Sequence, residues 1–461
     1  MDNTTSFIKK LLKTVPPVRL IVVSFFLLIL TGSILLTFPA ASRDGAWTPF
    51  INALFTSTSA VCVTGLVVFD TWTHWSIFGQ VVIICLIQVG GLGLVTFTTG
   101  FTLLLRRKLG LRGMQLAVES TGGNVIHIAH IVKIILYFTF SCEFTGALLL
   151  MLRFVPKFGL HGVWISVFTA ISAYCNAGFD ILGFETKGGS LMKYVGDPLV
   201  CLTVAALIII GGIGFIVISD FYYSKIKSHM NGKPPSHLNF HSHIVLITTA
   251  CLLVIGTIAI FISEYGNTMS GMNFGTRLNA SFFQSASART AGFNSLDIGG
   301  QTDFTKIITI ILMFIGASPT STGGGIKTTT MIVIIAAVFS VLRGDDDACF
   351  LKRRIDKPTV YRSLSITFLA MLVVLITSGI IILTTPHVTS INALFEAVSA
   401  FGTVGLTAGV TPSLSAIAKC AVIATMFIGR VGPVSIGLAF SLRKKRFTAS
   451  TVLPDGKIIV G

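Results

Sequence analysis

The sequence predicts an all-α polytopic membrane protein in which four tandem repeats surround one axis with pseudo-fourfold symmetry. Three observations predict this fold. Only 11% of the 461 residues are charged and 52% are hydrophobic, whereas soluble domains carry about 25% charged residues. Apolar stretches of about 20 residues, the length that crosses hydrocarbon, recur along the chain. A short segment that ends in glycine occurs four times at nearly constant spacing. This composition excludes an ordinary soluble enzyme.

Eight membrane spans are expected from the apolar windows. The windows cover residues 20–42, 71–105, 131–152, 198–219, 234–263, 307–326, 363–395 and 413–442. The first window follows Lys9, Lys10 and Lys13, so a secretory signal is the alternative interpretation. Its apolar run is longer than the usual 7–15 residues of a signal, and we therefore expect a retained helix.

The distribution of basic residues predicts the orientation, because short cytoplasmic loops retain Lys and Arg. With the N-terminus inside, 22 of the 34 Lys and Arg residues fall in inner segments. Both termini are therefore expected in the cytoplasm. The net charge of +16 follows from the same asymmetry. Nucleic-acid binding is a poor alternative, since the basic residues are scattered over several loops and tails.

The fourfold repeat is the strongest signal in the sequence. In each copy a phenylalanine lies ten residues before a glycine, with small residues between them. The four glycines are Gly65, Gly178, Gly292 and Gly405, separated by 113, 114 and 113 residues. This spacing divides the chain into repeats of residues 1–112, 113–228, 229–343 and 344–461, the last with a cytoplasmic C-terminal tail.

The segment before each glycine is too short to cross a bilayer at 1.5 Å per residue, so we expect a re-entrant pore helix. Such backbone survives at membrane depth only where it is buried in protein or lines water. Four of them around one axis form one ion pore, whose carbonyl oxygens replace a cation's hydration shell. The expected filter strands are Val61, Cys62, Val63, Thr64 and Gly65; Tyr174, Cys175, Asn176, Ala177 and Gly178; Ala288, Arg289, Thr290, Ala291 and Gly292; and Phe401, Gly402, Thr403, Val404 and Gly405. All four strands share a single glycine, which predicts one well-formed carbonyl ring with weaker flanking sites.

Glycine clusters interrupt the second helix of each repeat. In repeats 1, 2 and 4 they are expected to serve helix packing or a bend. In repeat 3 the break expands to residues 316–330, and we interpret it as an intramembrane gate loop. The expected gate residues are Gly316, Ala317, Ser318, Pro319, Thr320, Ser321, Thr322, Gly323, Gly324, Gly325, Lys327 and, from repeat 4, Arg430. A phosphate-binding loop is rejected there, because Ile326 separates Gly325 from Lys327 and no strand-turn-helix surrounds the motif.

Five charged residues lie within or next to otherwise apolar segments. Arg430 lies mid-span, where a charge is costly, and we expect it to contact the gate loop; a helix staple paired to a carboxylate is the alternative. Glu143 is also mid-span. Arg289 is expected behind the filter, with Glu396 as a candidate partner. Asp180, two residues after Gly178, either concentrates cations at the outer mouth or is a simple loop carboxylate.

These motifs resemble those of the Trk/Ktr/HKT superfamily of potassium transporters over essentially the whole chain. The resemblance rests on the fourfold pattern, on CVTGL (62–66), NAGFD (176–180), RTAGF (289–293) and GASPTSTGGGIK (316–327), and on Gly429-Arg430. A single span before the first pore helix is similar to the Ktr-type membrane subunit, called KtrB. Gly65 implies potassium, since members with serine there tend to pass sodium. The resemblance places K+ at Cys62, Val63, Thr64, Asn176, Thr290 and Thr403.

The resemblance further implies a homodimer with one pore per protomer, in the bilayer of a bacterial inner membrane. It implies gating by a cytoplasmic nucleotide-binding ring of RCK type, similar to KtrA, with Na+ as a possible activator. This chain has no glycine-rich nucleotide fold of its own, so we expect it to bind no nucleotide. A sodium- or proton-coupled symporter is the alternative function, although its broken helices normally come in inverted pairs. An enzyme is not expected, because the buried charges do not form a titratable cluster.

Overall fold

The computed structural model describes residues 17–104, 128–186, 188–227, 237–345 and 347–433, and helices make up most of these residues. The longer helices are α2 (Pro17–Thr37), α3 (Phe50–Cys62), α5 (Ile77–Leu104), α7 (Ile128–Phe158), α8 (Leu160–Tyr174), α9 (Pro198–Ile213), α12 (Phe240–Glu264), α13 (Phe274–Ser287), α14 (Asp303–Phe314), α15 (Thr328–Arg343), α16 (Lys357–Thr384), α17 (Ser390–Gly402) and α18 (Ala416–Val431). The shorter elements are η1 (Pro39–Ala41), α4 (Thr71–His74), η3 (Met192–Tyr194), α10 (Phe215–Phe221), the π-helical η4 (Tyr222–Lys227), the strand pair β1 (Cys349–Phe350) and β2 (Arg353–Arg354), and η5 (Thr411–Ser413). The basic residues before Pro17, the inner loop 105–127 and the C-terminal tail lie outside the described ranges.

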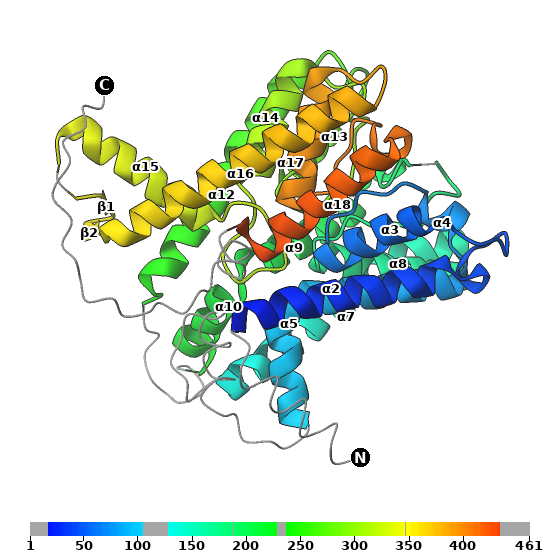
Figure 1. Ribbon diagram of the computed structural model, residues 1–461, viewed down its shortest axis with the longest axis horizontal. Helices are drawn as coiled ribbons and strands as arrows, with labels where there is room; N and C mark the ends of the chain where they lie inside the picture. Colours follow the sequence, from blue (N-terminus) through cyan, green and yellow to red (C-terminus); the bar gives the residue numbers. More distant parts are fainter. Residues whose placement is uncertain (1–16, 105–127, 187, 228–236, 346, 434–461) are drawn as a thin grey trace.

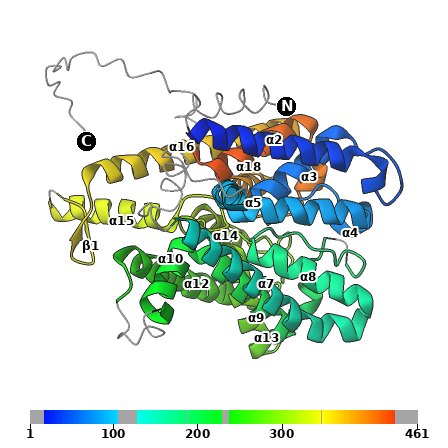
Figure 2. The same cartoon turned by 90° about the horizontal axis from the view of Figure 1, so that it is seen from below.

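The same three-helix unit occurs four times. A first helix (α2, α7, α12 or α16) packs against a short helix (α3, α8, α13 or α17), and a second helix follows (α5, α9, α14 or α18). Each second helix also packs against the short helix of the next repeat: α5 against α8, α9 against α13, α14 against α17, and α18 back against α3. The last contact joins repeat 4 to repeat 1, so the units form a closed ring (Figures 1 and 2).

The four short helices are the most deeply enclosed elements. α3 has 13 residues and α8 has 15, which gives roughly 20 Å of length against the about 30 Å of a hydrocarbon core. In α17, every residue from Phe395 to Gly402 is buried. Side chains of Thr389 and Asn273 cap α17 and α13 by accepting hydrogen bonds from the Asn392 and Thr276 amides. These helices therefore end inside the protein and do not cross it.

The second helices are broken, as their glycine clusters predict. Gly93, Gly214 and Gly432 have φ angles of 74°, 100° and 92°, in the region that favours glycine. At Gly214 the axis turns by 92° between α9 and α10. In repeat 3, α14 ends at Phe314 and α15 begins at Thr328, with a non-helical segment between them.

These breaks change how the expected spans appear. Within the described ranges, three helices are long and apolar enough to cross a membrane, and α9 with α10 would make a fourth as a bent span. The eight predicted spans are thus not eight continuous helices. The reason is physical: glycines with positive φ divide the second helices of repeats 1, 2 and 4, a long non-helical segment divides that of repeat 3, and α2 begins where the described residues begin.

Candidate functional site

The four repeat glycines meet in one ring at the ends of the short helices. The neighbours of each glycine show the order of this ring. A Cβ built on Gly65 would lie 2.4 Å from the Ala177 carbonyl oxygen, on Gly178 2.6 Å from that of Ala291, on Gly292 2.4 Å from that of Val404, and on Gly405 2.2 Å from that of Thr64. Each glycine therefore packs on the carbonyl that precedes the next repeat's glycine. No residue with a side chain fits these positions without displacing the ring.

A second ring of unusual backbone lies two residues before the glycines. Val63, Asn176, Thr290 and Thr403 all have positive φ angles, of 58°, 59°, 80° and 50°. Three of them are β-branched, for which this conformation is a genuine outlier that costs about 1–3 kcal/mol. Such strain persists only where the surrounding structure enforces it, and it clusters at functional sites. Sequence reasoning missed this feature, because it concentrated on the glycines.

Serine side chains hold the strands from behind, in two different ways. In repeats 1 and 4, the Oγ atoms of Ser59 and Ser399 accept hydrogen bonds from the Gly65 and Gly405 amides at 3.0 and 3.1 Å. In repeats 2 and 3, Ser172 Oγ and Ser287 Oγ instead donate to the carbonyls that follow Gly178 and Gly292, at 2.7 and 2.5 Å. The backbone of the ring thus follows an approximate fourfold symmetry, but the serine hydrogen bonds that stabilise it do not. In the sequence these serines were indistinguishable from the other small residues of the repeats.

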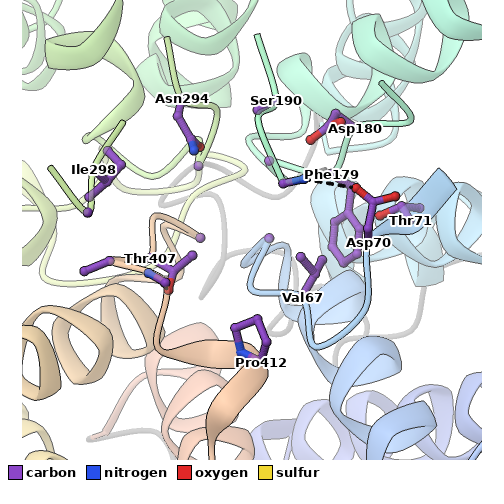
Figure 3. Close-up of a pocket in the computed structure, with 18 of the residues that line it drawn as sticks. Val67, Asp70, Thr71, Phe179, Asp180, Ser190, Asn294, Ile298, Thr407 and Pro412 are labelled. Atoms are coloured by element: carbon purple, nitrogen blue, oxygen red, sulfur yellow. Dashed lines mark hydrogen bonds between the residues drawn. The ribbon is translucent and has the colours of Figure 1, made fainter. Parts of the chain in front are cut away.

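An outer cavity of about 430 Å³ has the four glycines in its floor. Figure 3 shows side chains from all four post-glycine loops around it, among them Val67, Asp180, Asn294 and Thr407, each two residues after its glycine. Asp70 and Asp297 also line the cavity. Asp70 accepts hydrogen bonds from the Thr73 and Gly188 amides. We name this cavity the vestibule. Its carboxylates favour cations over anions.

Asp180 is the acidic residue closest in sequence to a ring glycine. It is half-buried, and its Oδ1 accepts a hydrogen bond from the Leu182 amide at 3.0 Å. Burial, with the Asp70 carboxylate nearby, raises the pKa of Asp180 to about 6, although the Leu182 amide acts in the opposite direction. The group is therefore charged at neutral pH and loses its charge in mild acid.

This charge yields a pH-dependent prediction for Asp180→Asn. Removing a carboxylate from a narrow entrance lowers the local cation concentration, so we expect the half-saturating cation concentration for flux to rise about two- to fivefold at a pH of about 7.5. Near pH 5 the wild-type carboxyl is mostly protonated, and the two proteins should become equal. Flux measured at both pH values checks this. A difference that persists unchanged at low pH would contradict the assignment of the effect to this charge.

The segment from Gly316 to Lys327 lies directly below the ring. The Gly324 amide donates to Thr403 Oγ1 at 2.9 Å. Thr322 Oγ1 donates to the carbonyls of Tyr174 and Gly211, at 3.3 and 3.1 Å. A Cβ on Gly323 would lie 2.2 Å from Thr290 Oγ1. The loop therefore touches the strands that end at Gly178, Gly292 and Gly405, in repeats 2, 3 and 4.

Arg430 connects this loop to another repeat. Its guanidinium is partly buried and donates to the Thr322 carbonyl in the loop and to the Gly90 carbonyl in α5. Lys327 Nζ folds back on the same loop and donates to the Gly323 carbonyl at 2.7 Å. Two cationic side chains thus bind backbone carbonyl oxygens of this segment. Among the described residues, Arg430 contacts these backbone carbonyls and forms no ion pair with a carboxylate, as the alternative of a helix staple would require.

The loop is also joined to the break in the second helix of repeat 2. The Ser318 amide donates to the Gly212 carbonyl at 3.1 Å, and the Phe215 amide donates to the Thr320 carbonyl at 3.1 Å. A Cβ on Gly214 would lie 2.4 Å from the Pro319 carbonyl oxygen. Ala317 and Ser318 are buried, whereas Pro319, Thr320 and Ser321 are partly exposed. Backbone groups of the loop therefore form hydrogen bonds with the backbone at the break between α9 and α10.

The suggested partnership of Arg289 with Glu396 is wrong. Arg289 points behind the strand, where its terminal nitrogens contact the carbonyl and Oγ1 of Thr249, both at 3.4 Å. Glu396 instead accepts hydrogen bonds from Thr407 at 2.9 Å and from Thr411. The two side chains belong to different repeats: Glu396 is bound by two hydroxyl groups, whereas Arg289 contacts only Thr249 and its buried Nε has no hydrogen-bond partner. Glu396 thereby ties the fourth pore helix to the vestibule wall at Thr407.

Glu143 lies behind the second strand. Gln88 Nε2 donates to both of its carboxylate oxygens, at 3.0 and 3.3 Å, and Cys175 Sγ lies 3.7 Å from Gln88 Oε1 as a donor. The buried carboxylate of Glu143 in α7 is thus linked to Cys175 both through Gln88 and by a direct contact of 4.0 Å between Cys175 Sγ and Glu143 Oε1. The sequence predicted that Glu143 lies mid-span, but it did not predict these contacts with Gln88 and Cys175.

Polar contacts at equivalent positions join neighbouring repeats. Lys306 and Lys419 each lie 14 residues after their ring glycine. They donate to Asn392 and Asn52, each 13 residues before the next repeat's glycine, at 3.2 and 3.0 Å. These contacts fix the outer ends of α17 and α3. The junction of repeats 1 and 2 has Trp164 donating to Gln80 at 2.9 Å in a similar place.

We expect Lys419→Met to weaken the closed ring. The substitution keeps much of the side-chain length but leaves the buried Asn52 Oδ1 without a donor, which costs about 1–3 kcal/mol of unfolding free energy. Thermal unfolding in detergent measures the loss. In a double-mutant cycle with Asn52→Ala, the two changes should be less than additive, since they remove one contact. Strict additivity would show that the contact contributes nothing.

Three comparisons with known proteins agree with each other. Residues 14–449 match the family described as TrkH, cation transport protein. The chain is 39% identical to the Ktr system potassium uptake protein B of Bacillus subtilis, over 96% of this chain and 97% of that protein. It is 38% identical to the potassium/sodium uptake protein NtpJ of Enterococcus hirae, over 98% and 99%. The crystal structure of the potassium transporter TrkH from Vibrio parahaemolyticus shares the fold, with a TM-score of 0.69, 16% identity, and coverage of 91% of this chain and 85% of that one.

Proposed function

Because the chain belongs to the TrkH family of cation transport proteins, we propose that it takes up potassium through a channel-like pore. The observation that carries this proposal is the ring in which each of four glycines packs on the carbonyl before the next. Carbonyl rings replace the hydration shell of K+ in potassium pores. The relatives named for potassium uptake, which are 38–39% identical over nearly their full length, support the same ion.

In this proposal the filter comprises the four strands that end at Gly65, Gly178, Gly292 and Gly405. K+ is bound at the level of Cys62, Val63, Thr64, Asn176, Thr290 and Thr403. The left-handed residues two positions before each glycine support this assignment, because their strain is maintained around the whole ring. The vestibule carboxylates raise the cation concentration at the outer mouth.

The segment 316–330 acts as the gate. Its hydrogen bonds to Tyr174 and Thr403 support this role, as do the contacts of Arg430 and Lys327 with carbonyl oxygens of the segment. Opening requires these hydrogen bonds to break or to move with the loop. A fixed positive charge at this level also raises the barrier to a passing cation.

Control of this gate is assigned to a cytoplasmic nucleotide-binding ring of RCK type acting on a homodimer, with Na+ as a possible activator. The name Ktr system, which the relative from Bacillus subtilis carries, supports a partner subunit, and the name of NtpJ supports a role for sodium. The inner loops and tail are the proposed docking surface. The protein itself works in a bacterial inner membrane with both termini in the cytoplasm.

Flux into proteoliposomes tests the function and separates it from the symporter alternative. A potassium channel moves 86Rb+ down its own gradient without sodium or a proton gradient, and its rate follows the membrane potential. If sodium acts only as an activator, it changes the rate of 86Rb+ flux without itself being transported. Strict stoichiometric movement of Na+ or H+ with K+ would establish the symporter, and absence of any cation flux would remove the proposal.

A further inference from the structure

An apolar groove of about 380 Å³ lies at the end of the bundle opposite the vestibule, between α7, α9, α10 and α12. With the exception of Tyr222, its lining is entirely aliphatic or phenyl. The lining residues are Ile134, Phe138, Ile210, Ile213, Val217, Ile218, Phe221, Tyr222, Leu238 and Leu246. Neither the filter nor the gate uses this groove.

The break at Gly214 creates the groove. Because the axis turns by 92° there, α10 runs sideways and leaves the space that a continuous α9 would have filled. The two flanking helices, α7 and α12, are among the helices long and apolar enough to span the membrane. Phe138, Leu246 and Phe221 are 36%, 37% and 51% exposed. The groove is therefore open to the hydrocarbon of the bilayer, where acyl chains are the surrounding solvent.

Two lysines adjoin lining residues of the groove in the sequence. Lys133, which is exposed, directly precedes the lining residue Ile134, and the half-buried Lys225 follows Tyr222 by three residues. The one carboxylate nearby in sequence, Asp220, is fully engaged: it accepts hydrogen bonds from the Asn239 amide, Asn239 Nδ2 and Ser242 Oγ, at 2.6–2.8 Å. Lys133 and Lys225 are of the charge that complements an anionic headgroup.

The helix that roofs the groove is joined directly to the loop below the ring. The first amides of α10, those of Phe215 and Ile216, donate to the carbonyl and Oγ1 of Thr320, at 3.1 and 3.4 Å. Asp220, near the other end of α10, ties it to the start of α12. A displacement of α10 by material in the groove would therefore move Thr320.

We propose that the groove binds an acyl chain of an anionic phospholipid and that its occupancy, through α10 and Thr320, biases the loop below the ring. The headgroup lies by Lys133 and Lys225, and the chain fills the space beside Val217 and Leu246. The effect on transport rests on the proposed gate, whereas the binding of lipid does not.

Lipid retention tests the binding by itself. The full chain, purified in mild detergent, is analysed by native mass spectrometry after addition of phosphatidylglycerol. Leu246→Trp fills the groove from α12, and Ile247→Trp is its control, because Ile247 is the next residue, is 45% exposed and does not line the groove. We expect Leu246→Trp, and Lys133→Gln with Lys225→Gln, to reduce bound phosphatidylglycerol about fivefold, with Ile247→Trp unchanged. Equal retention in Leu246→Trp and Ile247→Trp would overturn the proposal.

Flux tests the coupling. In proteoliposomes, 86Rb+ flux through the wild type should differ about fivefold between phosphatidylcholine alone and phosphatidylcholine with phosphatidylglycerol, and Leu246→Trp should remove the difference while Ile247→Trp keeps it. Lipid-dependent flux that is identical in the two variants overturns the coupling. No flux in any vesicle refutes the proposed function, and retention still decides the groove. Efficient disulfide cross-linking of Leu246→Cys between two copies would identify the groove as a protein interface and overturn the lipid assignment.

Discussion

Gly65→Ser is expected to lower the preference of the pore for K+ over Na+ by about tenfold, equivalent to about 1.4 kcal/mol between the two ions. The Cβ of the serine would lie 2.4 Å from the Ala177 carbonyl oxygen, and the residue would have to keep a φ of 90°. Either the carbonyl turns away or the first strand retreats. In both cases the ring loses coordination that a dehydrated K+ requires. Uptake of K+ and Na+ in a transport-deficient bacterial strain measures the ratio.

The matched control is Gly45→Ser. Gly45 also has a positive φ, of 66°, but no atom lies within 4 Å of its Cβ position. It therefore introduces the same kind of backbone strain without a collision, and its ion preference should equal that of the wild type. An unchanged preference in Gly65→Ser, with normal amounts of protein in the membrane, would remove the filter assignment.

Arg430→Ala is expected to raise the maximal flux about fivefold, in the range of typical coupling between two states of a protein. The guanidinium connects the Thr322 carbonyl of the loop with the Gly90 carbonyl of α5. Its loss frees the loop and removes a positive charge from the cation's path. Flux at saturating potassium, normalised to protein in the membrane, gives the comparison.

Arg430→Lys serves as the control for charge. It keeps a cation at this depth but cannot donate to both carbonyls in the planar geometry of a guanidinium, so an intermediate flux is expected. If Arg430→Ala yields no assembled protein while Arg430→Lys assembles normally, the side chain is a structural staple and the gate assignment fails.

The sequence predicted the repeat architecture because the four glycines are spaced at nearly equal intervals, and their meeting in one ring follows from that architecture. The helix breaks at Gly93, Gly214 and Gly432 were also signalled by glycine clusters. What these residues do in transport stays a prediction.

Other features depend on contacts between segments far apart, which one sequence does not reveal. The Arg289 side chain contacts Thr249, 40 residues away, because α12 passes behind the third strand. Likewise, Arg430 contacts Gly90, 340 residues away. Val63, Thr290 and Thr403 have positive φ angles, which β-branched residues normally avoid. Their residue types alone would therefore have predicted negative φ angles. Only the closed ring enforces the positive ones.

The unequal serine supports have a consequence for how such a ring can diversify. Ser59 and Ser399 fix amides, whereas Ser172 and Ser287 fix carbonyls. Since one gene encodes all four quadrants, a point mutation alters a single quadrant and leaves three intact. An assembly of identical subunits has no such freedom, because every change there is multiplied by four. In this chain a single mutation can therefore alter the support of one quadrant of the ring while the other three keep theirs.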